Sequence, residues 1–135
     1  SVLVMMMGGD GEAEPAQEDV AGGKFDAAED SWLLLEGVTT PVPTSGGAST
    51  TVRYSLGIRF DGGQTEQTEV ITKWQQGNNL MILRGLADDV MKKYDLDRVR
   101  DESFKRTYAT ELKKELNIQI SDDVKLINVY ELRYD

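Results

Sequence analysis

The stretch that most constrains the fold is "TVRYSLGIRFDGG", residues 51–63. Apolar and polar residues alternate along it, and its apolar members are Val52, Tyr54, Leu56, Ile58 and Phe60. A period of two places these side chains on one face of a strand, and the Asp-Gly-Gly that follows is a stop signal. The sequence therefore predicts a half-buried strand over residues 51–60, with one apolar and one polar face.

Three further segments before residue 95 have recognisable patterns. Residues 31–43, "SWLLLEGVTTPVP", contain a short apolar run and two prolines, which suit an edge strand. Residues 65–79 place Val70, Ile71 and Trp74 at helical spacing, although a Val-Ile-Thr run also suits a strand, and we favour a short helix. Residues 80–94 repeat apolar side chains with a period near 3.6, which predicts an amphipathic helix with a core face.

The last part of the chain predicts one more helix and one more strand. The helix is indicated by an apolar residue at every fourth position, namely Phe104, Tyr108, Leu112 and Leu116. In "VKLINVYELRY", residues 124–134, alternation puts Val124, Leu126, Tyr130, Leu132 and Tyr134 on one face and Ile127 and Val129 on the other. A strand that is apolar on both faces is expected inside a sheet or at a contact with another subunit.

Together these elements predict one α+β domain over residues 31–135. Its order is strand, strand, helices, strand, with two or three helices packed on one face of a small antiparallel or mixed sheet. Residues 8–30 carry eight acidic side chains against the single Lys24, a balance of −7, and predict an acidic flexible linker. The apolar run of residues 1–7, "SVLVMMM", is interpreted as the end of a transmembrane helix or as a disordered apolar terminus.

Composition excludes several classes of function. The chain has no cysteine and no histidine, which removes thiol nucleophiles, disulfides, most zinc sites and the commonest general acid–base side chain. The net charge is −9, and no basic patch with interleaved aromatic residues occurs, so nucleic acid is not an expected partner.

Acidic clusters have ordinary structural explanations. Asp88 and Asp89 each precede a lysine by four residues, Lys92 and Lys93, so exposed i,i+4 ion pairs account for them, and Glu102 with Arg106 repeats the pattern. The acids of residues 95–102 lack the glycine of a calcium loop. We therefore predict no catalytic residue, no cofactor and no metal site. Trp32 and Trp74 are expected in the core, with interface anchors as the alternative.

Four stretches resemble the periplasmic part of the flagellar basal-body-associated protein FliL family. They are "LLEGVTTPV", "VRYSLGIRF", "NNLMILRGLADDVMKKYDLDRV" and "ESFKRTYATELKKELN" followed by "VKLINVYELRY". The resemblance covers residues 32–134 and implies a stomatin-like fold. It also implies a single-pass protein of the bacterial inner membrane whose domain lies in the periplasm, associates with stator units of the flagellar motor, forms rings and supports motility without enzymatic activity.

Two alternatives stay open beside this interpretation. One is a soluble assembly protein, such as a phage or pilus component, whose N-terminal arm packs on a neighbouring subunit. The other, a small-molecule binding module, is disfavoured because no convergent polar groups are recognisable. For contacts with motor proteins or with other copies, the candidate residues are Arg53 and Arg59, on the polar face of the second strand, and Ile127 and Val129. The alternative is that the arginines are only solvated and the two aliphatic residues belong to the core.

Overall fold

The computed structural model describes residues 31–134, so the predictions for the apolar run and the acidic linker lie outside the described residues. The elements in chain order are β2 (Leu33–Pro43), β3 (Ser49–Phe60), α1 (Gln64–Trp74), α2 (Gly77–Met91), α3 (Leu96–Val99), α4 (Phe104–Gln119) and β4 (Val124–Tyr134). The predicted α+β class and the predicted order of elements are confirmed.

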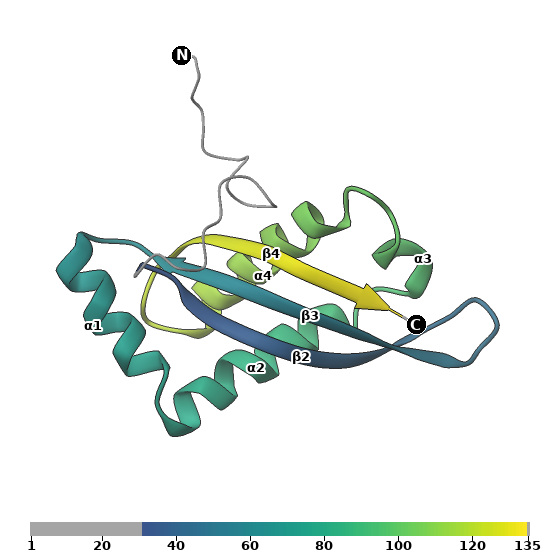
Figure 1. Ribbon diagram of the computed structural model, residues 1–135, viewed down its shortest axis with the longest axis horizontal. Helices are drawn as coiled ribbons and strands as arrows, with labels where there is room; N and C mark the ends of the chain where they lie inside the picture. Colours follow the sequence, from purple (N-terminus) through teal and green to yellow (C-terminus); the bar gives the residue numbers. More distant parts are fainter. Residues whose placement is uncertain (1–30, 135) are drawn as a thin grey trace, which may run out of the picture.

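The three strands form one antiparallel sheet with the order β2-β3-β4 (Figure 1). The alternating strand predicted from residues 51–60 is its central strand β3, with Val52, Tyr54, Leu56 and Ile58 fully buried. The proline-containing strand β2 lies at an edge, as predicted. Within residues 31–134, β4 pairs with β3 alone, so β4 is not internal to the sheet there.

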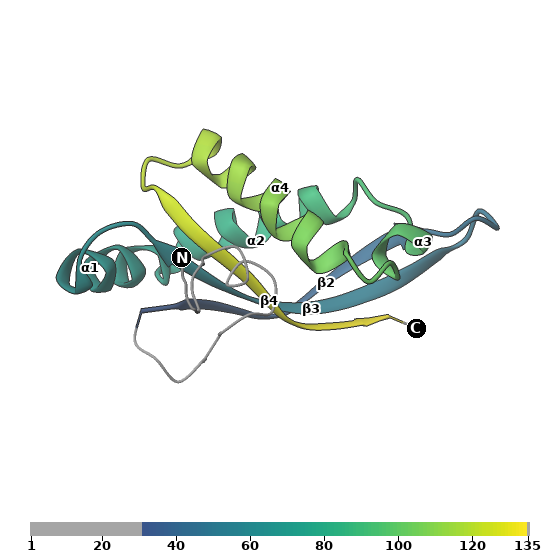
Figure 2. The ribbon, with the colours of Figure 1, turned by 90° about the horizontal axis from the view of Figure 1, so that it is seen from above.

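Helices α2 and α4 lie side by side on the same face of the sheet (Figure 2). The fourfold pattern of α4 is confirmed, because its four repeating apolar side chains are all buried. They pack on the apolar face of β3 together with Leu83, Ala87 and Val90 of α2. No helix of residues 31–134 is both long enough and apolar enough to cross a bilayer.

The boundaries of the helices differ modestly from the predicted ones. The ambiguous segment is helical, as favoured, and forms α1, whose buried residues are Ile71 and Trp74. Helix α2 begins at Gly77, three residues before the predicted start. The four-residue helix α3 was not predicted; Asp95 caps it by accepting a hydrogen bond from the Arg98 backbone amide.

The predicted faces of β4 were wrong because the strand is irregular. Its register against β3 shifts between Phe60 and Arg59 and again between Leu56 and Ser55. Each shift inserts an extra residue, and an extra residue reverses which face the following side chains occupy. Val124, Ile127 and Val129 therefore all belong to the core, whereas Leu126 pairs with Arg59 on the opposite face.

Candidate interaction face

The sheet face opposite α2 and α4 carries the polar members of β3. Figure 2 shows both helices on one side of the sheet, and no helix of residues 31–134 crosses the other side. We call that other side the helix-free face. Its best-defined row runs straight across the sheet, from Thr39 on β2 to Arg53 on β3 and Arg133 on β4.

Arg53 and Arg133 lie directly opposite each other on neighbouring strands. Together with Thr39 and Thr51 they line a shallow hollow of about 360 Å³. Like charges in this position repel, so the pair is more stable when an anionic group lies between or above the guanidinium groups. Glu131 supplies part of this negative charge, because its carboxylate lies 3.3 Å from Nη2 of Arg133. Within residues 31–134, Arg53 forms no ion pair.

A bulge in β2 shapes the floor beside Arg53. Register shifts between Leu35 and Val38, and Gly37 has a φ of 65°, which an L side chain rarely adopts. The Gly37 amide donates to Ser55 Oγ at 3.1 Å, and Ser55 Oγ donates to Glu131 at 3.0 Å. A Cβ at position 37 would lie 3.3 Å from Nη2 of Arg53, so the guanidinium packs over the bare glycine.

Arg59 lies on the same face, where the chain enters the sheet. Its guanidinium carbon is 4.5 Å from the centre of the Trp32 ring, a cation–π distance. Its Nη2 donates to Ser31 Oγ at 3.0 Å. Arg59 therefore holds Ser31 and Trp32 beside the end of β3.

The structure separates the four predicted contact residues. Arg53 and Arg59 share the helix-free face, six positions apart along β3. Ile127 and Val129 are 0% and 1% exposed and belong to the hydrophobic core, so the folded domain offers neither side chain to a partner. The two tryptophans are both 6% exposed, and Trp74 belongs to the core, as expected.

The covered face holds a buried polar cluster that the sequence patterns did not predict. Thr40 donates to Asp88 Oδ1 at 2.6 Å, so Thr40 accepts the 2.9 Å hydrogen bond from Tyr54. Tyr108 donates to the Ala87 carbonyl at 2.8 Å, and its ring meets that of Tyr54 edge to face. The cluster joins β2, β3, α2 and α4, and its hydroxyl groups are buried, which is typical of a structural network.

Asp88 joins this cluster to the surface. Its predicted ion pair with Lys92 is present at 2.8 Å. Burial alone would raise the pKa of Asp88, but hydrogen bonds from Lys92 and Thr40 outweigh burial and lower it. Burial also raises the pKa of Tyr54 to about 12.

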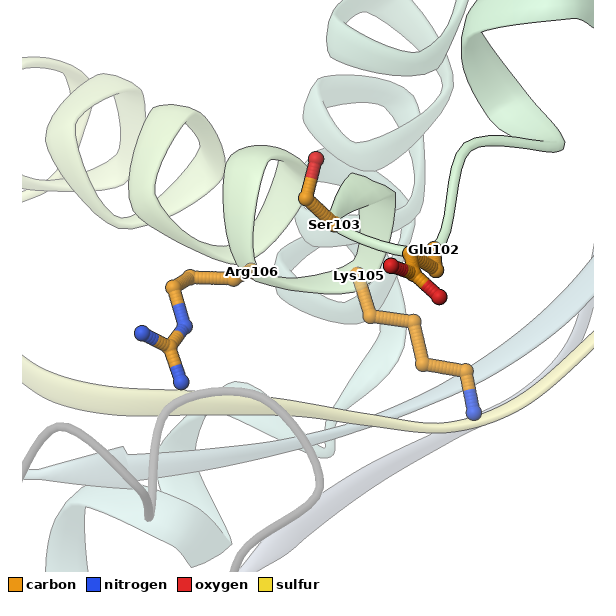
Figure 3. A pocket seen from close by; sticks show the side chains of 4 residues that line it. All are labelled: Glu102, Ser103, Lys105 and Arg106. Carbon is orange, nitrogen blue, oxygen red and sulfur yellow. The ribbon is translucent and has the colours of Figure 1, made fainter.

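The predicted pair of Glu102 and Arg106 does not form. Both residues line a shallow hollow at the start of α4, with Ser103 and Lys105 (Figure 3). The figure shows Arg106 pointing away from the Glu102 carboxylate, and none of the ion pairs in residues 31–134 joins them. The hollow combines both signs of charge on exposed side chains, so it gives no ligand class.

Two apolar side chains of α2 are exposed although the helix has a good core face. Met81 is 68% exposed and Ile82 is 47% exposed. Sequence reasoning missed them as contact candidates, although both fall outside the repeat formed by Leu80, Leu83 and Leu86. An adjacent pair of apolar residues off the core stripe is the signal that could have found them.

Within the described part of the chain, no three histidine, cysteine or acidic residues are grouped to hold a metal ion. No protein-family model matches the sequence, and no curated protein matches it.

Proposed function

We propose that the chain is a non-enzymatic scaffold protein of the bacterial flagellar motor, anchored in the inner membrane with its folded domain in the periplasm. In this proposal a membrane anchor precedes the acidic segment, and the domain contacts stator proteins and other copies of itself. The resemblance of residues 32–134 to the FliL family motivates it, and a stomatin-like arrangement of the sheet and helices is part of it.

One observation supports a contact function above all others. The sheet is covered by helices on one face, and its other face carries two opposed arginines that bring positive charge to a shallow hollow. Such a face suits recognition of an acidic protein surface. The exposed apolar pair Met81 and Ile82 supplies a second surface, suited to packing between copies.

Photocrosslinking in motile cells of the source organism tests the proposal. A photoreactive amino acid replaces Arg53 in one variant and exposed Lys114 of α4 in a matched control. Crosslinks from position 53 to stator proteins, absent from position 114, are expected, together with loss of motility when the gene is deleted. Recovery of cytosolic proteins alone would overturn the periplasmic assignment.

The gene sequence upstream of Ser1 separates this proposal from a soluble assembly protein. A bilayer is spanned by about 20 apolar residues, so the anchor requires roughly 10 to 15 more apolar residues before "SVLVMMM". A start codon immediately before Ser1 would favour the soluble alternative.

A further inference from the structure

The helix-free face and the acidic segment of the same chain have opposite charges. The face presents Arg53 and Arg133 around one hollow and Arg59 near the start of the domain, and the Glu131 carboxylate beside Arg133 offsets one of these three positive charges. Residues 8–30 have a balance of −7, whereas the rest of the chain, with sixteen acidic and fourteen basic residues, is close to neutral at −2. The acidic segment is thus the most complementary part of the chain for this face.

We infer that residues 8–30 dock on the helix-free face of their own domain, with the carboxylates of Glu18 and Asp19 in the hollow between Arg53 and Arg133. A guanidinium group binds a carboxylate through two parallel hydrogen bonds, and the Thr39 and Thr51 hydroxyls that line the hollow can donate as well. Docking relieves the repulsion between the two opposed arginines.

The length of the segment allows this placement. Arg59 holds Ser31 on the helix-free face, and Arg53 lies six positions farther along β3, about 20 Å at the rise of a strand. Glu18 and Asp19 precede Ser31 by thirteen and twelve positions, and an extended chain of that length spans about 40 Å. A chain of this length is therefore long enough for the carboxylates to reach the hollow.

Covalent attachment favours the chain's own segment over that of another copy. A tethered group has an effective concentration in the millimolar range, which exceeds the protein concentration of ordinary solutions. The docked segment would occupy the same arginines that an acidic partner uses, so docking competes with such a partner. This inference rests on the charges of the chain and does not depend on the flagellar assignment.

Paramagnetic relaxation in the full chain tests the inference. The sequence has no cysteine, so Gln17→Cys gives a single site for a nitroxide label beside the two carboxylates. We expect selective broadening of the amide signals of residues 51–55 and 131–133, with the amides of α4 as the internal reference. Raising salt from about 10 mM to about 1 M shortens the Debye length from about 30 Å to about 3 Å and should abolish the broadening.

Two double variants test whether the arginines are required for docking. Arg53→Gln with Arg133→Gln should remove the broadening. Lys93→Gln with Lys114→Gln removes the same charge from exposed positions, one just after α2 and one in α4, and should retain it. The amide spectrum itself reports whether each variant is folded. Even broadening over sheet and helices, or broadening unchanged in the double arginine variant, would overturn the inference. Broadening of isotope-labelled chains by separate spin-labelled chains would overturn docking within one chain.

Discussion

At the scale of single residues, the Ala87 carbonyl is the centre of the covered face. Tyr108 of α4 donates to it at 2.8 Å, and the Tyr54 oxygen of β3 lies 3.2 Å from it although the Tyr54 proton is donated to Thr40. A buried carbonyl that keeps its donor avoids a desolvation cost, so the Tyr108 hydrogen bond helps to fix how α2 sits against α4.

Tyr108→Phe tests the strength of the shorter bond. The ring and its edge-to-face contact stay, and only the donor to Ala87 is lost, so we expect a loss of about 1 kcal/mol in the free energy of unfolding, measured by urea titration. The control is Tyr94→Phe, because in residues 31–134 the Tyr94 hydroxyl forms no hydrogen bond. A change within about 0.5 kcal/mol is expected there. Equal losses in both variants would contradict the assigned role of the Tyr108 hydroxyl.

The buried phenols also predict how stability depends on alkaline pH. The pKa of the Tyr54 hydroxyl is raised from 10.0 to about 12, so between these pH values the unfolded chain releases this proton before the folded chain does. The protonated hydroxyl therefore makes its full contribution to the free energy of unfolding below pH 10, and that contribution is lost as the pH rises toward 12. One such group contributes a slope of about 1.4 kcal/mol per pH unit. In urea titrations at a series of pH values above 10, the free energy of unfolding of Tyr54→Phe should fall less steeply with pH than that of the unsubstituted protein. An unchanged slope would mean that Tyr54 ionises equally in both states.

At the scale of elements, α1 is attached to the rest of the domain by few groups. Besides its buried residues Ile71 and Trp74, its C-terminal end is held by Asp122, which lies just before β4. The Asp122 carboxylate accepts from Trp74 Nε1 at 2.7 Å and from Lys73 Nζ at 2.8 Å. Those two hydrogen bonds lower the pKa of Asp122.

Asp122→Ala should loosen α1 without affecting α4. We expect faster amide hydrogen exchange in residues 64–74 and unchanged exchange in residues 104–119, because the lost hydrogen bonds restrain only the end of α1. Asp123→Ala is the matched control, since it removes the adjacent carboxylate and neither of these bonds. Faster exchange across both helices would show that Asp122 stabilises the whole domain.

Elements with a regular period were predictable from the sequence, and irregular ones were not. Val52 to Phe60 and Phe104 to Leu116 repeat without interruption, so their buried faces followed directly from the period. In β4 the two extra residues, opposite Arg59 and Ser55 of β3, reverse which sheet face the following side chains occupy. Nothing in "VKLINVYELRY" marks an extra residue. For the candidate face, the alternation predicted that Arg53 and Arg59 share the polar face of this strand. Pairing of Arg53 with Arg133 depends on register between distant segments, which one strand's pattern cannot give.

At the scale of the whole molecule, one core joins the sheet to the helices. Side chains from β2, β3, β4, α1, α2 and α4 belong to the same cluster of buried residues. A single shared core favours all-or-none unfolding, because no part can separate without exposing its neighbours.

Two optical signals test this cooperativity. Tryptophan fluorescence reports on Trp32 at the start of the sheet and on Trp74 in α1, whereas far-ultraviolet circular dichroism reports on all helices. We expect the two urea transitions to coincide, with the same midpoint and the same slope. A fluorescence transition at lower urea would mean that α1 unfolds as a separate unit.

The prolines of β2 have a consequence for how copies of the domain can associate. Pro41 and Pro43 remove two backbone donors from this edge strand, and the bulge at Gly37 bends it. An edge of this kind is a poor template for another strand, so β2 protects the sheet against edge-to-edge growth into fibres. Many copies of the domain can then lie close together without β2 starting aggregation.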